Sequence, residues 1–292
     1  MNGHKFLGRG LRILVLLLTV GVLAGGAADK TAPPQGAVTL AYKFTEGAAL
    51  SYKQTGQQTQ NLDVMGQTMT TESNSSMDLT FKSKGLKGEN YILGVAIDGM
   101  AVSVNSPQGG ITPDLSGIIG KSFDLVFSPV GKEVDVSGAS VFTIDMGQSG
   151  RRDMSSNFQG LFPDLPDHPV KVGDKWPSED AIIQKSDVGD IHINFKNEHT
   201  LDGFETIDGR ECARIKTVSK GTMAGALNQS GVSLAMDAKL DGNDTWYFAT
   251  KEGIFVKNEA KGTMGGLINV EAMNMSIGFT GEQKSSLALV KK

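Results

Sequence analysis

Side chains that could bind a metal are few in this sequence, and their spacing does not bring them together. His192 and His199 lie seven residues apart on one apparent strand. The two-residue repeat of a strand therefore places them on opposite faces. His168 lies in a proline-rich segment, and His4 lies near the start of the chain. A tetrahedral metal site needs three or four converging ligands, so no metal site is predicted.

Other patterns with possible chemistry have simpler interpretations. Asp241-Gly242-Asn243-Asp244 carries oxygen ligands but lacks the spacing and the closing glutamate of a calcium loop, and a turn is predicted there. Neither a Gly-x-Ser-x-Gly elbow nor a phosphate-binding glycine loop is present. The sequence thus predicts no cofactor and no enzyme. A carboxylate-pair hydrolase stays open, because such pairs meet only in three dimensions, and a concave pocket with converging ionisable groups would favour it.

Apolar side chains on inferred strands suggest a cavity. Methionine suits adaptable binding surfaces, and several methionines occupy these strands. Met273 and Met275 are expected to share one face with Ile277 and Phe279. The candidate cavity residues are Leu234, Met236, Met273, Met275, Ile277 and Phe279. The alternative is an ordinary sheet core, because apolar strand faces normally pack.

The elements that must position these side chains are strands. Apolar and polar residues alternate through 77–82, 123–127, 191–196, 232–239 and 273–280. One buried and one solvated face is typical of antiparallel sheets. Asp-Gly pairs at Asp98 and Asp208 supply hairpin turns. The C-terminal part is predicted as strands near 231–240, 244–249, 253–261, 266–280 and 284–290.

A stretch near 140–162 departs from alternation. Phe142, Met146, Met154 and Phe158 recur mostly at multiples of four, which favours a helix face. Ser140 could cap its start, and Pro163 marks its end. Because three glycines weaken it, one or two short helices are expected. The predicted fold class is mainly β, a curved antiparallel sheet or half-barrel with one or two short helices.

The N-terminal residues have the order of an export signal. Three basic residues precede an apolar run that ends in small residues, so 1–28 is predicted to be a signal peptide. An uncleaved anchor is the alternative, although the run is short for a membrane span. No cysteine lies near the cleavage region, so a lipid anchor is not expected. The predicted location is the periplasm or the extracellular space, with no stable membrane span after cleavage.

Residues 29–36 are polar and contain prolines, and they are predicted to form a tether. A single β-rich domain is expected over 37–292. A weak echo between the segments around Tyr52 and Trp176 leaves open two similar halves, 37–165 and 166–292. Cys212 is the single cysteine, so no intrachain disulfide can form, and it is expected to be buried.

The acidic balance excludes one class of partner. The whole chain has a formal net charge of −4, and removal of 1–28 takes away three positive charges and no negative ones. An acidic surface gives no electrostatic reason to bind nucleic acid.

Residues 162–176 are the most distinctive motif. A Pro-rich segment leads into Val-Lys-Val-Gly-Asp-x-Trp, which ends at Trp176. Together with 120–131, 244–248 and 253–257, it resembles a family of uncharacterised secreted bacterial β-proteins, a domain of unknown function. The layout is more distantly similar to lipoprotein-carrier half-barrels, in which a curved antiparallel sheet wraps helices or an apolar ligand. The family has no assigned activity, so the resemblance assigns no functional residue.

The sequence therefore predicts an exported, non-catalytic binding module that holds an apolar ligand, such as a lipid, within a curved sheet. The alternative is a structural or interaction protein of the cell envelope with a filled core. The protein partner is not specified, and whether the space enclosed by the sheet is empty or filled separates the two hypotheses.

Overall fold

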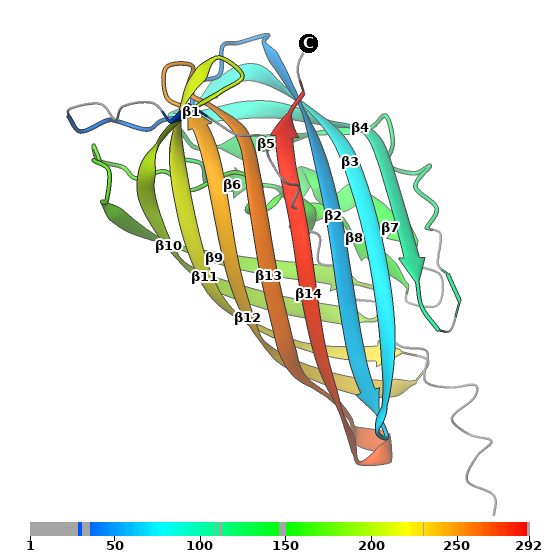
Figure 1. Cartoon of the computed structure of the whole chain (residues 1–292). Coiled ribbons are helices and arrows are strands. Elements are labelled where there is room, and N and C mark those ends of the chain that lie inside the picture. The colour runs from blue at the N-terminus through cyan, green and yellow to red at the C-terminus, as the bar shows by residue number, and fades with distance from the viewer. Residues whose placement is uncertain are drawn as a thin grey trace, which may run out of the picture.

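The structure is a computed structural model that describes residues 29–30, 36–107, 109–110, 113–145, 150–229 and 231–290. The predicted signal peptide, 1–28, lies outside the described residues. The predicted fold class is confirmed: the chain forms a curved, antiparallel half-barrel sheet with short helical turns (Figure 1). Among the described residues, no helix is long and apolar enough to cross a membrane.

Fourteen strands form one sheet. The strands are β1 Asp29–Lys30, β2 Ala49–Val64, β3 Gln67–Lys87, β4 Asn90–Asn105, β5 Ser122–Phe127, β6 Glu133–Asp135, β7 Thr143–Asp145, β8 Arg151–Asp153, β9 Lys175–Ser186, β10 Gly189–Ile207, β11 Arg210–Gln229, β12 Val232–Ala249, β13 Ile254–Val270 and β14 Met275–Leu289. Their order is β6-β5-β4-β3-β2-β14-β13-β12-β11-β10-β9-β8-β7, and every pair is antiparallel. Pairing of β2 with β14 joins the N-terminal and C-terminal strands into a continuous sheet. The division into two similar halves stays a prediction.

The N-terminal tether is partly fixed to the sheet. Within the predicted 29–36 segment, β1 pairs with β10 at Thr206 and Glu205. Residues 31–35 lie outside the described part of the chain. The polar tether over 29–36 stays a prediction, with backbone hydrogen bonding of β1 to β10 as its described contact with the sheet.

The C-terminal strands are longer than predicted, and several predicted strand ends lie inside them. The turn expected at Asp241–Asp244 is absent, because this segment pairs with β11 on one side and β13 on the other as part of β12. The predicted breaks near 262–265 and 281–283 likewise lie inside β13 and β14. Glycines at these places allow neighbouring side chains and backbone to approach, rather than ending the strands. A Cβ at Gly281, for example, would lie 2.9 Å from Met264 Cγ.

Among its described residues, the predicted helical stretch contains the 3₁₀ turns η1 Ser137–Val141 and η3 Ser155–Phe158, with β7 and β8 between them. Another 3₁₀ turn, η4 Glu271–Met273, precedes β14. Short helical turns near 140–162 are therefore present, but the expectation that Ser140 caps the start of a helix is wrong. Ser140 lies inside η1, where its hydroxyl donates to the Ser137 carbonyl.

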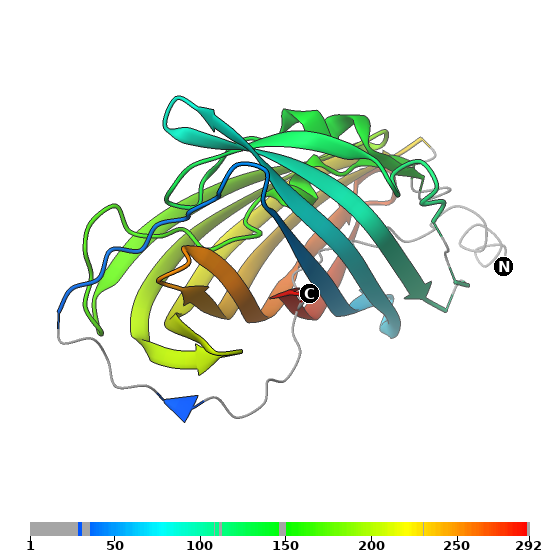
Figure 2. The ribbon, with the colours of Figure 1, turned by 90° about the horizontal axis from the view of Figure 1, so that it is seen from above.

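The segment 128–170 closes the open side of the curled sheet. It begins next to one edge, where β6 pairs with β5, and returns to the other, where β8 pairs with β9. Figure 2 shows the sheet curling round a space with this green segment across it. An N-terminal stretch packs against it: Val38 bridges to Val170, and the Tyr42 amide donates to the Pro129 carbonyl.

Two apolar clusters fill opposite ends of the interior. We call the first the aromatic cluster; its rings are Tyr42, Phe44, Tyr52, Phe81, Phe127, Phe162 and Phe255. We call the second the far cluster; it consists of Leu62, Ile191, Ile193, Met223, Leu227, Leu234, Met236, Ala238, Leu240, Met264, Ile268, Val270, Ile277 and Phe279. Leu62 on β2 and Ile193 on β10 belong to the same cluster although four strands separate them in the sheet. The far cluster therefore runs along the concave face from β2 through β14, β13, β12 and β11 to β10.

Candidate functional site

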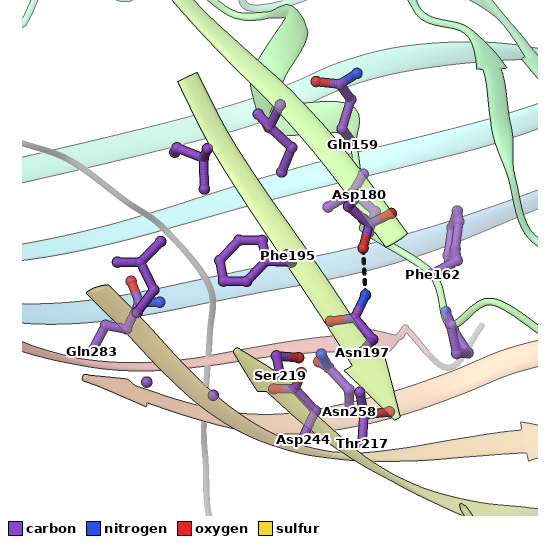
Figure 3. A pocket seen from close by; sticks show the side chains of 18 of the residues that line it. Gln159, Phe162, Asp180, Phe195, Asn197, Thr217, Ser219, Asp244, Asn258 and Gln283 are labelled. Atoms are coloured by element: carbon purple, nitrogen blue, oxygen red, sulfur yellow. Dashed lines mark hydrogen bonds between the residues drawn. The ribbon is translucent and has the colours of Figure 1, made fainter. Parts of the chain in front are cut away.

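A cavity of about 170 Å³ lies inside the curl, between the two clusters. Phe162 and Leu287 contribute to its wall from the first cluster, and Leu240 and Met264 contribute from the second. Part of the 128–170 segment, from Ser156 to Asp164, forms another wall. Figure 3 shows side chains from several elements directed into this space. The interior is thus filled at both ends and hollow between them.

Strand alternation explains which side chains reach the cavity. On β9 to β12 the lining positions include every second residue, and their side chains share the concave face. These paired positions are Ser178 and Asp180, Asn197 and His199, and Thr217 and Ser219, with Asp244 on β12. Polar side chains therefore gather halfway along the strands, where an apolar core would continue in an ordinary sheet.

A chain of hydrogen bonds crosses three strands at this level. Asn197 Nδ2 donates to Asp180 Oδ2 at 2.6 Å and to Ser178 Oγ at 3.1 Å. Ser178 Oγ is hydrogen-bonded to His199 Nε2 at 2.9 Å, and His199 Nδ1 is hydrogen-bonded to Thr217 Oγ1 at 2.7 Å. Each member thereby fixes the rotamer of the next, so the wall is preorganised.

Burial keeps His199 uncharged. Removal from water lowers the pKa of the imidazole to about 4, so the ring is neutral at pH 7. One ring nitrogen then donates while the other accepts. The Trp176 ring stacks on the imidazole with centroids 5.5 Å apart. A strand partner on each side and a stacked indole therefore hold His199 in place.

The distinctive Val-Lys-Val-Gly-Asp-x-Trp motif anchors the 128–170 segment to the sheet. Val170 pairs with Val38, and the Gly173 amide donates to the Leu201 carbonyl. The Asp174 carboxylate accepts from the Lys171 amide, closing the turn. Trp176 Nε1 donates to the Asp164 carbonyl at 2.9 Å. The motif's polar and aromatic positions thus serve the fold beside the cavity.

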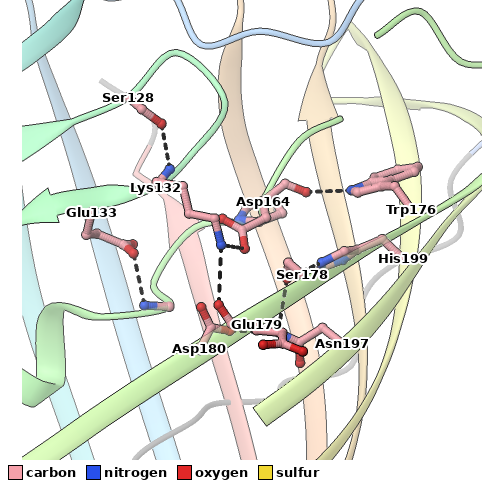
Figure 4. Close-up of polar contacts among 12 residues, drawn as sticks. Ser128, Lys132, Glu133, Asp164, Trp176, Ser178, Glu179, Asp180, Asn197 and His199 are labelled. Carbon is pink, nitrogen blue, oxygen red and sulfur yellow. Dashed lines mark hydrogen bonds and ion pairs between the residues drawn. The ribbon is translucent and has the colours of Figure 1, made fainter. Parts of the chain in front are cut away.

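An ion pair fixes the other side of the cavity wall. Lys132 Nζ lies 2.6 Å from Asp164 Oδ2 and also donates to the Glu179 carbonyl at 3.5 Å (Figure 4). The Lys132 amide donates to Ser128 Oγ. Because the lysine bridges the 128–170 segment to β9, it holds that segment over the cavity.

Three cavity carboxyls have pKa values shifted upward by burial. Desolvation raises the pKa of Glu133 to about 8 and that of Asp244 to about 7. Burial also raises the pKa of Asp180, and the negative charge of Asp164 adds to the shift. Glu133 keeps one acceptor bond, from the Gly160 amide to Oε2. Ionising these carboxyl groups costs free energy in the folded protein. Their oxygens can therefore accept a hydrogen bond from a ligand that carries a donor.

Several buried polar atoms beside the cavity lack a partner. Among the described residues, no hydrogen bond reaches Glu133 Oε1, Ser156 Oγ, Trp246 Nε1 or Gln283 Oε1. All four residues line the cavity. Buried polar atoms are normally paired, so this concentration is unusual for a region that serves only to pack.

Part of the wall is apolar. Ile182, Ile193, Phe195, Leu240 and Met264 contribute to this part of the lining. Apolar walls with a few placed polar groups are typical of small-molecule sites. The arrangement can therefore hold a molecule that has both an apolar part and hydrogen-bonding groups.

The six residues predicted from the sequence lie outside this cavity lining. Leu234, Met236, Ile277 and Phe279 are buried in the far cluster, and Met275 packs against it. Met273 is 46% exposed on η4, so the expectation that it shares a strand face with Ile277 is wrong. The strand begins only at Met275, after Asn274 adopts a left-handed conformation. Leu240 and Met264, on neighbouring inward positions, do reach the cavity.

The polar cavity residues were missed because apolar alternation was used to find inward faces. A signal existed in β2, where Gln54, Gln58 and Gln60 occupy inward positions and are buried. Polar residues on the inward side of an otherwise apolar alternation mark a place where the core is interrupted. Glu133 and Asp164 carried no such signal, since Glu133 begins the three-residue strand β6 and Asp164 lies outside any strand, and both reach the site through tertiary contacts.

Other predicted features lie away from the cavity. Cys212 is buried, and burial raises the pKa of its thiol to about 12. His192 is exposed while His199 is buried, as the strand period requires. The described residues contain no group of three or more histidine, cysteine or acidic side chains placed to hold a metal ion.

No protein-family model matches the chain, and no curated protein sequence matches it. The solved structures that align over most of its length include two outer membrane proteins. An outer membrane channel from Pseudomonas putida F1 is 8% identical, with 85% of this chain and 97% of that chain covered and a TM-score of 0.21. OmpT, an outer membrane protein of Vibrio cholerae, is 9% identical, with coverages of 84% and 100% and a TM-score of 0.17. Neither similarity is close enough to support an argument about function.

Proposed function

We propose that this chain is an exported, non-catalytic binding protein that holds a small amphipathic molecule, or one end of a longer lipid, in the central cavity. The observation that carries the proposal is the hollow between two packed clusters, with an apolar wall and unpartnered polar atoms around it. A sheet that served only as a scaffold would gain stability by filling this space, because each unfilled volume costs packing energy.

The size of the cavity limits the ligand. A volume of about 170 Å³ is close to that of an engineered cavity that binds benzene. A complete two-chain lipid does not fit such a space. The expected occupant is therefore about the size of a six-carbon chain, or it is a longer molecule whose remainder lies outside.

Methionine methyl groups provide a direct test. Met264 lines the cavity, whereas Met65 is 76% exposed in the turn between β2 and β3. In protein labelled with ¹³C at methionine methyls, titration with 1-hexanol should shift the Met264 signal saturably and leave the Met65 signal in place. Equal or non-saturating shifts at both positions would contradict the proposal.

A blocking variant ties that signal to the cavity. Gln283 lines the space and has an unpartnered Oε1, so Gln283→Trp should fill it and weaken 1-hexanol binding about tenfold or more. Glu282→Trp is the matched control, because Glu282 is the preceding residue on β14 and points to solvent. Similar losses in the two variants would mean that binding occurs elsewhere.

The alternative, a structural or interaction protein of the envelope, finds support in the aromatic cluster. The ring centre of Phe162 lies within 6.0 Å of the ring centres of five other residues, Tyr42, Tyr52, Phe81, Phe127 and Phe255. That end of the interior is a filled core. A protein of this second kind would give no saturable Met264 response to any small molecule.

A hydrolytic role is favoured by one observation, the Ser178–His199 hydrogen bond at the cavity wall. A serine beside a histidine base is the start of a nucleophilic site. Here, however, a threonine hydroxyl rather than a carboxylate is hydrogen-bonded to the second ring nitrogen, so the orienting carboxylate of such a site is missing there. Incubation with a fluorophosphonate probe should leave Ser178 unmodified. Labelling at Ser178, lost in Ser178→Ala, would favour a hydrolase instead.

A further inference from the structure

Negative groups outnumber positive groups around the cavity. Four carboxylate side chains line it, those of Glu133, Asp164, Asp180 and Asp244, against the cationic side chain of Arg152. Asp241 and Lys261 also border it, but both are exposed at outward positions of β12 and β13, and the Asp241 carboxylate pairs with Lys220. Lys132 does not alter this balance at the cavity, because its ammonium is held by Asp164 and the Glu179 carbonyl.

Asp244 is the most unusual of these acids. It lies on β12 between the inward-facing Gly242 and Trp246, and Figure 3 shows its side chain beside those of Thr217, Ser219 and Asn258. Its side chain is half-buried at the cavity wall, and no ion pair or side-chain hydrogen bond reaches it from the residues that the structure describes. A partly desolvated acid without a donor gains no stability from a partner, so packing does not explain its presence.

Unpartnered acceptors recur across the cavity. Glu133 Oε1 and Gln283 Oε1 are buried and lack a donor among the described residues. Asp180 accepts from Asn197 through Oδ2. Acceptors on facing elements, with an apolar wall beside them, match a ligand that carries hydrogen-bond donors at one end and hydrocarbon at the other.

We propose that the cavity selects a small organic cation, in which an alkylammonium head binds the Asp244 carboxylate and the hydrocarbon lies against Phe195, Leu240 and Met264. The inference rests on the proposed binding function and names the ligand's chemical class. An ammonium supplies three donors and the charge that buried carboxylates lack. A fatty-acid carboxylate would instead place a second negative charge beside Asp244 and Glu133.

Ionisation couples this binding to pH. In the free protein, burial raises the pKa of Asp244 to about 7 and that of Glu133 to about 8. A bound cation favours the ionised carboxylates, so binding releases protons, and affinity should increase as pH rises through these values and fall below them. The other charged or titratable groups on the cavity side are Asp180 on β9, His199 on β10, and Lys132, Arg152 and Asp164 on the 128–170 segment, while Asp241 and Lys261 lie at exposed, outward positions of β12 and β13.

Calorimetry with three six-carbon probes tests the proposal on the full-length mature protein. At pH 8.5, hexylammonium should bind about tenfold or more tightly than 1-hexanol, and hexanoate should bind most weakly. Hexylammonium affinity should fall about tenfold between pH 8.5 and pH 5.5, while 1-hexanol affinity should change little. Equal affinity for hexylammonium and 1-hexanol would overturn the cation inference and leave the proposed binding function standing. No binding of any probe would overturn both.

A matched pair of variants locates the head group. Asp244→Asn should remove most of the preference for hexylammonium over 1-hexanol, whereas Asp237→Asn should preserve it. Asp237 lies on the same strand but is exposed on the outer face. Retention of the preference in Asp244→Asn would exclude Asp244 as the head-group contact. If Asp244→Asn does not fold, the pH dependence of the wild-type protein still decides the question.

Discussion

The aromatic cluster and the cavity lie on the same concave face but differ in what their side chains contact. In the cluster, rings pack edge to face, as with Tyr42 and Phe127 at 4.9 Å between centroids. Around the cavity, carboxyl, amide and hydroxyl groups border open space, and several buried polar atoms lack partners. Both regions are positioned by the same strand alternation, so the residue types at inward positions decide whether a stretch of sheet packs or stays hollow.

This contrast separates stability from function within one sheet. The aromatic cluster contributes dispersion and area burial, which the fold requires. The cavity keeps buried acids that work against stability, so its residues are expected to have been retained for binding. Substitutions in the first region should mainly change the free energy of unfolding, while those in the second should mainly change ligand affinity.

The largest stability effect is expected at Phe162, the ring where the aromatic cluster meets the cavity. Phe162→Ala removes contacts with five other rings, and it should lower the free energy of unfolding by about 3–5 kcal/mol in urea denaturation. Val141→Ala, at a position 74% exposed, should change it by less than about 0.5 kcal/mol. Similar small effects at both sites would mean that the cluster is not a packed core.

Two methionines sharpen the comparison inside the far cluster. Met223 is fully buried among packed residues, whereas Met264 borders the cavity. Met223→Ala should cost about 2–4 kcal/mol in unfolding free energy, and Met264→Ala should cost at least about 1 kcal/mol less, because part of its surroundings is already unfilled. Equal costs in parallel urea denaturation experiments would show that the Met264 wall is as tightly packed as the Met223 site.

At Glu133, unlike the sites above, a substitution is expected to stabilise the folded protein. Its pKa is raised to about 8 in the fold from an ordinary value of 4.5, so the unfolded chain ionises first as pH rises. The penalty is absent at pH 4 and grows between pH 4.5 and 8. Glu133→Gln should therefore raise the unfolding free energy by about 1–3 kcal/mol at pH 8 and change it little at pH 4. A gain of equal size at both pH values would contradict buried ionisation as the cause.

The smallest effect is expected at Cys212, which lies outside both interior regions, in a minor buried cluster with Ala249 and Val256. Burial raises the pKa of its thiol to about 12, so little thiolate forms at pH 8. A disulfide reagent such as dithionitrobenzoate should react negligibly with the native protein at pH 8 and fully in denaturant. Rapid reaction in the native state would show that the thiol is accessible.

Much of the fold could be predicted from alternation, because inward apolar residues on β10, β12 and β14 leave a direct record in the sequence. Strand ends were less predictable. Asp241–Asp244 has the composition of a turn, but hydrogen bonding to β11 and β13 keeps it extended. Tertiary pairing therefore overrides local turn preference at that position.

The candidate site was harder to predict, since its components come from distant segments. Glu133 and Asp180 meet only after the 128–170 segment crosses the opening of the sheet, and neither residue is distinctive in its local sequence. Leu234 and Met236 have the same apolar character as Leu240 and Met264 on neighbouring inward positions. The curl of the sheet determines that Leu234 and Met236 pack in the far cluster, whereas Leu240 and Met264 border the cavity.

The central claim is that this hollow, rather than either packed cluster, takes up a ligand. A crystal structure of the protein grown with 1-bromohexane, collected at the bromine absorption edge, would locate the probe directly. The account predicts one anomalous peak beside Phe195, Leu240 and Met264, lost in Gln283→Trp. A peak among Leu234, Met236, Ile277 and Phe279 instead, or no interior peak at all, would contradict it.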